Sequence, residues 1–166
     1  TQIPDGRVLI GGLFEYYNDQ RVSRITGVLP NGAIDTSLHL GTGANDYVWA
    51  ITGLGDGKIM VGGAFNLFND VPAVRIVRLL ANGEVDTTFQ SGTGANDGVH
   101  RVVEQPDGRL IIVGSFTDYN GVPRRKLARL EPDGALDLSF DPGTGCDQNI
   151  QDVLLLNDGR ILIAGD

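Results

Sequence analysis

The chain has little cysteine, few cations and no long apolar segment, and each shortage excludes a class of protein. One Cys cannot form a disulfide framework and does not support a Cys-based zinc site. Lys and Arg number 13 against 21 Asp and Glu, for a net charge of -8. This argues against a nucleic-acid partner, because such binding needs clustered positive charge. No apolar run approaches the roughly 20 residues that cross a bilayer, so we expect no membrane insertion.

Glycine is abundant by contrast, at 24 of 166 residues, and much of it recurs every 51 residues. Asp-Gly followed by Arg or Lys stands at residues 5–7, 56–58, 107–109 and 158–160. A second Asn-Gly or Asp-Gly turn keeps this period at residues 31–32, 82–83 and 133–134, and Gly-Thr-Gly keeps it at 41–43, 92–94 and 143–145. The period predicts one repeat domain, 1–166, with repeats at approximately 1–46, 47–97, 98–148 and, in part, 149–166.

Each repeat has the pattern of four antiparallel strands. Short apolar runs such as residues 58–61, bounded by turn residues, are typical of strands buried on both faces. The preceding Asp-Gly predicts a two-residue type I′ hairpin with the segment from Val48 to Leu54. After a loop of about ten residues, residues 75–80 predict a third strand, which the Asn82-Gly83 turn joins to a fourth at 85–89.

A four-stranded sheet repeated at this length is typical of a β-propeller blade. The predicted fold is therefore all-β, with about three and a quarter blades in an open or partial propeller. A β-solenoid with two coils per repeat is the alternative. Because propellers usually have four to eight blades, we expect a piece of a longer chain, or else a protomer that self-associates. No charged-then-apolar leader follows Thr1, so we expect a targeting signal to be absent or already removed.

Three kinds of recurring residue are explained by this blade. Turn glycines allow tight turns, paired glycines let backbones approach closely, and aromatic side chains are expected to wedge between blades. Aspartates three residues after a turn glycine are expected to brace the hairpin by accepting backbone N–H bonds. The residues given these structural roles are Gly6, Gly12, Gly32, Gly57, Gly63, Gly83, Gly108, Gly114, Gly134, Phe14, Phe65, Phe116, Asp35, Asp86 and Asp137.

The third repeat carries the clearest motif. Residues 106–116, Tyr119-Asn-Gly and residues 127–140, which end in Leu-Asp-Leu-Ser-Phe, resemble the delta-60 repeat, a bacterial β-propeller-like tandem repeat. Likeness to kelch repeats is weaker and rests on the Gly-Gly pair. The first repeat departs from the motif, since Gly27 replaces an Arg and Leu38 replaces a Phe. The resemblance implies a binding or adhesion module of a large secreted or surface protein, and it carries over no catalytic residue.

Candidate ligand contacts are aromatic residues that can bury area and still offer a polar group. They are Tyr16, Tyr17, Trp49, Phe68 and Tyr119. Tyr17, Phe68 and Tyr119 share one repeat column, so packing within the blade is the other interpretation of these three. His39 and His100 do not occupy equivalent positions and are interpreted as ordinary loop or channel-edge residues. Cys146 is interpreted as a small buried thiol.

The Gly-Thr-Gly loops contain candidate oxygen ligands for Ca²⁺, which favours several carboxylate and amide groups. These candidates are Asn45, Asp46, Asn96, Asp97 and Asp147. Turns braced by the same side chains are the other interpretation, and no other cofactor is expected. The sequence lacks the common hydrolase, P-loop and zinc-protease motifs.

The first functional hypothesis is a non-enzymatic binding module. It would belong to a secreted or cell-surface bacterial protein, or to a virion fibre, and its loops would contact a protein or a glycan. The second is a structural repeat that pairs only with other blades of its own or a neighbouring chain. A propeller hydrolase or lyase is the third.

Overall fold

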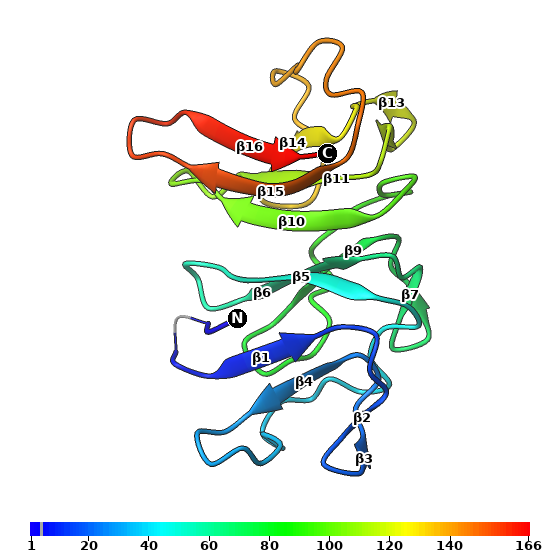
Figure 1. Cartoon of the computed structure of the whole chain (residues 1–166), viewed down its shortest axis with the longest axis vertical. Helices are drawn as coiled ribbons and strands as arrows, with labels where there is room; N and C mark the ends of the chain where they lie inside the picture. The colour runs from blue at the N-terminus through cyan, green and yellow to red at the C-terminus, as the bar shows by residue number, and fades with distance from the viewer. Residues whose placement is uncertain (4) are drawn as a thin grey trace.

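The computed structural model describes residues 1–3 and 5–166, and over these residues it consists of strands and turns with no helix (Figure 1). The second repeat forms the sheet β5-β6-β9, made of Val48–Gly53, Ile59–Gly63 and Ile76–Leu79. The third forms β10-β11-β14, made of Val99–Glu104, Leu110–Gly114 and Leu127–Leu130. Neighbouring strands pair antiparallel. The predicted all-β, propeller-type fold is confirmed.

The first and last repeats contribute smaller sheets. The first has β1 (Val8–Gly11) paired with β4 (Ile25–Val28), and the last has β15 (Ile150–Leu155) paired with β16 (Ile161–Gly165). Strands β1, β5, β10 and β15 follow one another along the long axis of the molecule (Figure 1), and β10 contacts both β5 and β15. No helix in the described residues could span a membrane.

The predicted fourth strand is shorter than expected. It is reduced to single bridges, Val85 to Leu79 in the second repeat and Leu136 to Leu130 in the third. The reason lies in the next residue, because the Asp86 carboxylate accepts the backbone N–H of Thr88 at 3.0 Å. This turn, which is closed by the Asp86 side chain, bends the backbone away from β9 before further residues can pair with that strand.

Two predictions about the connections between strands also need correction. The Asp56-Gly57 hairpin closes with hydrogen bonds from Leu54 N–H to the Lys58 carbonyl and from Gly57 N–H to the Leu54 carbonyl. Only Gly57 has positive φ, so the connection is a three-residue loop with a terminal left-handed residue, not a type I′ turn.

The second correction concerns the segment expected as a plain loop. In the second repeat it forms a small ribbon of β7 (Leu67–Phe68) and β8 (Val71–Pro72), because Asn69 and Asp70 both adopt positive φ. These are the residue types that tolerate the left-handed region best after Gly. The first and third repeats have the same ribbon, as β2 (Tyr16–Tyr17) with β3 (Gln20–Arg21) and β12 (Asp118–Tyr119) with β13 (Val122–Pro123).

The core lies between successive repeats rather than within any one of them. In β6, Ile59 and Val61 belong to the cluster shared with the first repeat, whereas Met60 belongs to the cluster shared with the third. Strand β11 alternates in the same way, with Ile112 on one side and Ile111 on the other. Successive side chains of a strand point to opposite faces, so the continuous apolar runs arise from burial on both sides.

The aromatic side chains predicted to wedge between blades, and the glycines predicted where backbones approach closely, fit this packing between repeats. Phe65 and Phe116 are fully buried in the first and second inter-repeat clusters, and Phe14 is half-buried. A Cβ on Gly63 would overlap the Tyr47 carbonyl, and one on Gly114 would overlap the Gly98 carbonyl. The hairpin glycines have positive φ, namely Gly6, Gly32, Gly57, Gly83, Gly108 and Gly134.

Candidate functional site

The first strand of each of the last three repeats contains one β-bulge. In β5 the pairing register shifts between Val48 and Ala50, in β10 between Val99 and Arg101, and in β15 between Ile150 and Asp152. The bulged residues are Trp49, His100 and Gln151, which we call the bulge column. A bulge re-aims its side chain and is common beside functional sites. These three side chains line one open hollow of about 430 Å³.

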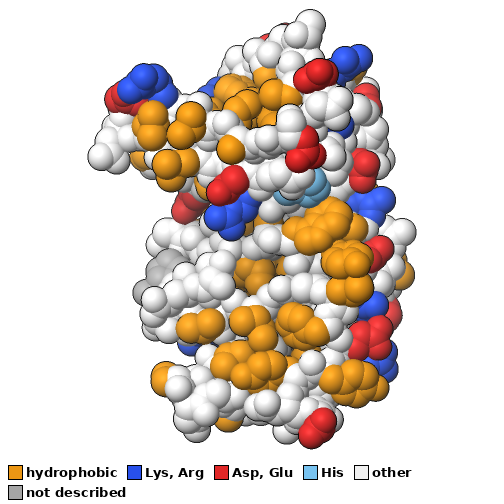
Figure 2. Space-filling view, viewed as in Figure 1, with side chains coloured by type: hydrophobic (Ala, Val, Ile, Leu, Met, Phe, Trp, Pro, Cys, Tyr) orange, Lys and Arg blue, Asp and Glu red, His pale blue; other side chains and the backbone are white. Residues whose placement is uncertain are grey.

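Trp49 and His100 make the central contact of the bulge column. Their rings meet edge to face, with centroids 5.0 Å apart and planes at 87°. Tyr47 stacks on the other side of Trp49 at 5.7 Å and 28°. Trp49 is 43% exposed and Tyr47 is 39% exposed. Figure 2 shows apolar side chains beside a histidine on this face of the molecule.

Gly98 makes room for this arrangement. It stands 51 residues after Tyr47, so the two are equivalent positions in their repeats. A Cβ on Gly98 would overlap the Trp49 ring. The bulky aromatic residue of the second repeat is therefore accommodated by a glycine in the third.

His100 is held by two hydrogen bonds. Nδ1 lies 3.0 Å from the Ile150 carbonyl oxygen, and Nε2 lies 2.9 Å from the Ser115 Oγ. A carbonyl only accepts, so Nδ1 carries a proton and donates to it, whereas the Ser115 hydroxyl can either donate to Nε2 or accept from it. Both partners fix the ring orientation against Trp49. Ser115 differs from its equivalent in the second repeat, Ala64.

An ion pair flanks the bulge column on the same strands. Arg101 Nε donates to Asp152 Oδ1 at 2.8 Å, and both side chains are about half exposed. This hydrogen bond from Arg101 is the largest influence on Asp152 and lowers the pKa of its carboxyl group. The residues after the second and third bulges thus add a charged, hydrophilic margin to the aromatic centre.

The five residues predicted as ligand contacts lie in different environments in the structure. Trp49 lies in the bulge column, whereas Tyr16 is exposed on the β2–β3 ribbon. Tyr17 is half-buried and donates its hydroxyl to the Gly32 carbonyl at 3.0 Å. Phe68 and Tyr119 must be corrected, because they are 1% and 0% exposed and pack in the inter-repeat clusters. They act as packing residues and cannot reach a ligand.

Sequence reasoning missed Tyr47, Gln151 and the role of His100. The bulge could not be read from residue types, since it depends on strand register. One signal was present: position 49 and its equivalents carry Trp, His and Gln, whereas the flanking positions Val48, Val99 and Ile150 are uniformly apolar. A position that varies among Trp, His and Gln directly after an apolar residue indicates an outward side chain.

The candidate calcium ligands brace backbone turns. Asn45 Oδ1 accepts the N–H groups of Asn66 and Leu67, and Asn96 Oδ1 accepts those of Thr117 and Asp118. Asp46 and Asp97 each accept the N–H of the following residue, and Asp147 is exposed. Within residues 1–3 and 5–166, no three His, Cys, Asp or Glu side chains gather as a metal site would require.

His39 and Cys146 both lie outside the bulge column. His39 Nδ1 is 3.7 Å from Glu84 Oε1, and the His39 side chain is 64% exposed. Cys146 is half-buried and packs against the third inter-repeat cluster. Neither therefore contributes to the hollow.

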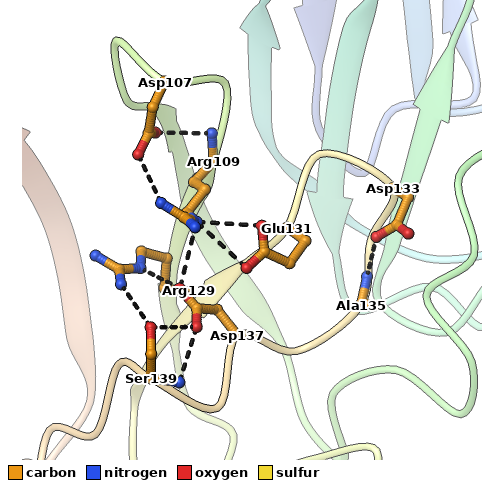
Figure 3. A network of polar contacts seen from close by, with 8 residues as sticks. All are labelled: Asp107, Arg109, Arg129, Glu131, Asp133, Ala135, Asp137 and Ser139. Carbon is orange, nitrogen blue, oxygen red and sulfur yellow. Dashed lines mark hydrogen bonds and ion pairs between the residues drawn. The ribbon is translucent and has the colours of Figure 1, made fainter.

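An Arg–Asp pair with a buried carboxylate recurs in the second and third repeats. Arg78 Nε donates to Asp86 at 2.8 Å, and Arg129 Nε donates to Asp137 at 2.7 Å. Each guanidinium also covers a ring, Phe89 at 5.0 Å and Phe140 at 4.9 Å. Figure 3 shows that Arg109 joins Arg129 at the Asp137 carboxylate, where Ser139 also donates.

These hydrogen bonds depress the pKa of both aspartates. For Asp137 the Ser139 hydroxyl has the largest effect; burial opposes it, the Ser139 N–H and Arg129 add to it, and the pKa falls to about 2. For Asp86 burial acts most strongly and raises the pKa, but donors from Thr88, Lys58 and Arg78 outweigh it and hold the pKa well below its usual range. Asp35 likewise accepts the N–H and hydroxyl of Ser37.

The first repeat replaces this pair with an apolar contact. Gly27 stands where the other repeats have Arg78 and Arg129, and Leu38 stands in place of Phe89. Leu38 lies so close over Gly27 that a Cβ there would overlap it, and Leu38 is buried. The departure of the first repeat from the motif is therefore compensated locally.

Comparison with protein families gives three matched segments, one in each of the first three repeats. The family model described as a domain of unknown function (DUF5122) β-propeller matches residues 3–38, 54–89 and 105–140, which together make up more than half of the chain. Comparisons with curated proteins and with solved structures gave no match. The matched segments are spaced by the same period as the hairpins and bulges, and the chain belongs to the DUF5122 β-propeller family.

Proposed function

We propose that this β-propeller repeat domain is a non-enzymatic binding module whose bulge column contacts a glycan or a protein surface. The observation that carries the proposal is the convergence of Trp49, His100 and Gln151 on one hollow through three successive β-bulges. Packing alone does not require it, because Trp49 remains 43% exposed. The proposed setting outside the cell, on a bacterial surface or a virion fibre, is supported by the resemblance of the repeat to delta-60.

A glycan suits the chemistry of the hollow better than a flat protein surface. Tyr47 and Trp49 are stacked, with 28° between their ring planes, and their partly exposed rings offer apolar surface at the hollow. Aromatic faces bury the apolar side of a ligand, while a few placed polar groups fix its orientation. Gln151 supplies an amide with both donors and an acceptor. Arg101 and Asp152 at the margin extend the polar contacts.

The Ser115–His100 contact favours a second candidate, a hydrolase, but two features of its geometry weigh against it. The Nδ1 of His100 faces a backbone carbonyl, whereas a carboxylate usually orients the histidine that activates a serine nucleophile. The Ser115 N–H is bonded to the Gly98 carbonyl at 2.9 Å and cannot stabilise an oxyanion. A fluorophosphonate probe should leave Ser115 unlabelled, and stoichiometric labelling would overturn the non-enzymatic proposal.

The binding proposal is tested on an array of bacterial and host oligosaccharides probed with the purified chain. Trp49→Ala should weaken the strongest signal about 30-fold or more, because a hot-spot aromatic contributes about 2 kcal/mol or more. Tyr16→Ala is the matched control, since Tyr16 is also an exposed aromatic, at 63%, but lies on the β2–β3 ribbon. Equal loss in both variants contradicts the assignment of the site, and an array without signal contradicts the glycan assignment.

A further inference from the structure

The aspartate that bends the chain after the fourth-strand bridge has two cationic partners in the second and third repeats. Asp86 is paired with Arg78 at 2.8 Å and with Lys58 at 3.2 Å. The equivalent Asp137 has an arginine in each of these two places, at 2.7 and 3.4 Å (Figure 3). Both aspartates are 4% exposed. Burying a carboxylate is costly unless it is paired, so the two cations offset the burial.

Asp35, the equivalent residue of the first repeat, is buried without either cation. It is 7% exposed. Gly27 stands where the paired arginine would be, and Arg7, at the position of the second cation, is paired with Asp5. Asp35 Oδ1 accepts the N–H and the hydroxyl of Ser37. Among the described residues, no donor bonds to Oδ2 and no cation forms an ion pair with the carboxylate.

Asp35 also lines an open groove of about 270 Å³ within the first repeat. The groove runs between Val22, which follows the β2–β3 ribbon, Thr26 of β4 and Leu38. Thr26 brings a hydroxyl to a position that is Val or Ala in the next two repeats. The packing of Leu38 over Gly27 fills space but supplies no positive charge. The first repeat therefore combines a groove with a carboxylate that no cation neutralises.

Arg21 is the one cation among the described residues that lines the groove. It is exposed, and it forms no ion pair with a described carboxylate. Exposed charges contribute little to stability, so Arg21 does not offset the burial of Asp35 as a paired guanidinium would. A buried negative charge thus lies beside space that is open to solvent.

The third repeat shows that an arginine side chain can be buried at this place in the fold. Arg124 is equivalent to Val22, which lines the groove, and it is 8% exposed. The two backbones match: the Val22 N–H donates to the Glu15 carbonyl at 2.9 Å, and the Arg124 N–H donates to the Thr117 carbonyl at 2.8 Å. The corner between the ribbon and the sheet therefore accommodates a long cationic side chain.

We propose that the groove of the first repeat binds an arginine side chain of a partner protein, whose guanidinium pairs with Asp35. A guanidinium can donate two parallel N–H groups to one carboxylate, and arginine already fills this role within the second and third repeats. The net charge of -8 attracts a basic partner over a longer range. The groove shares no lining residue with the bulge column, so this site is independent of glycan binding.

The test titrates the isotope-labelled 166-residue chain with Nα-acetylarginine amide, in which the guanidinium is the only charge, and follows the backbone amide resonances. The amides of Thr36 and Ser37 should shift and saturate, whereas those of Thr87 and Thr88, beside the already paired Asp86, should not. Nα-acetylcitrulline amide, in which a neutral urea replaces the guanidinium, is the matched probe and should bind about 10-fold more weakly or worse. No shift with the arginine probe, or equal affinity for both probes, would overturn the proposal.

Two variants test the role of Asp35 in binding. Asp35→Asn keeps the Oδ1 that accepts from Ser37, so the turn should persist while the affinity for the arginine probe falls about 10-fold or more. Gly27→Arg combined with Leu38→Phe gives the first repeat the arginine and the ring of the next two repeats. This double variant should pair Asp35 internally and abolish binding. Undiminished binding in either variant would contradict the site.

Two controls separate binding at Asp35 from indirect effects. Amide resonances of the second and third repeats should keep their positions in every variant, which shows that the chain is folded. Arg21→Ala removes a groove charge of the same sign as the probe, so it should bind the probe at least as tightly as the wild type. Weaker binding would count against the proposal, because removing a repelling charge cannot weaken a pairing with Asp35.

Discussion

Trp49 and His100 stand one repeat apart in sequence and meet edge to face, with ring centroids 5.0 Å apart. His100→Ala should therefore expose more of the Trp49 indole, which is the single Trp of the chain. We expect a larger acrylamide quenching constant for its fluorescence. His39→Ala is the control, because His39 lies near Glu84 and outside the bulge column. Equal quenching in wild type and His100→Ala would show that the contact does not persist in solution.

The buried Arg78–Asp86 pair should contribute strongly to stability. Arg78→Ala leaves the Asp86 carboxylate buried with fewer partners, which typically costs about 3 to 5 kcal/mol of unfolding free energy. We expect the lower end, about 3 kcal/mol, because Lys58 also lies 3.2 Å from Asp86. Arg101→Ala, which breaks the exposed pair with Asp152, should cost less than about 1 kcal/mol. Urea unfolding measures the free energy of unfolding of both variants. Similar losses in the two would contradict the claim that the buried pair contributes more than the exposed one.

The pKa of Asp137, lowered to about 2, predicts a specific acid sensitivity. A carboxyl group with a lowered folded-state pKa adds stability that is fully present above its unfolded pKa of about 3.9. That stability is lost as the pH falls toward 2. Asp137→Asn should therefore be less stable than wild type at pH 6, and the difference should disappear between about pH 4 and 2.

Denaturant unfolding across this pH range provides the measurement for Asp137→Asn. Asp158→Asn, at an exposed turn of the last repeat, is the control for removing one negative charge. A deficit for Asp137→Asn that stays constant from pH 6 to pH 2 would argue that the loss is steric and unconnected with ionisation.

Gly114 should tolerate no side chain. A Cβ there would overlap the Gly98 carbonyl, so the neighbouring strand would have to move. Gly114→Ala should lower the unfolding free energy by about 1 to 3 kcal/mol or more. Gly55→Ala is the matched control, because its Cβ would meet only Glu104 Oε2 at 3.6 Å. Thermal denaturation measures the stability of both variants. Equal losses in Gly114→Ala and Gly55→Ala would contradict the close contact between Gly114 and the Gly98 carbonyl.

The repeat and its strands were predictable because the signals are local. Asp-Gly turns fix hairpin positions, and apolar runs such as 110–112 indicate strands buried on both faces. The exact turn geometry and the shortened fourth strand were not predictable. They depend on hydrogen bonds such as Asp86 to Thr88, which compete with strand pairing over a single residue.

The candidate site was only partly predictable. Trp49 was found because exposed aromatics are plausible ligand contacts, but Phe68 and Tyr119 have the same composition signal and are buried. Residue type alone cannot separate the two cases. His100 and Gln151 join Trp49 only because a bulge recurs at one register position. That is a property of backbone pairing between distant segments.

The alternation of β6 and β11 between two separate clusters makes each repeat depend on its immediate neighbours alone. Loss of order then starts at the termini and moves inward one module at a time, as in a one-dimensional chain of coupled units. Amides of β6 and β11 would exchange with solvent most slowly, and those of β1 and β16 earliest. The stability of the whole array therefore depends on the packing energy at each interface between repeats. A weak interface in the middle would divide the array into two halves that unfold independently.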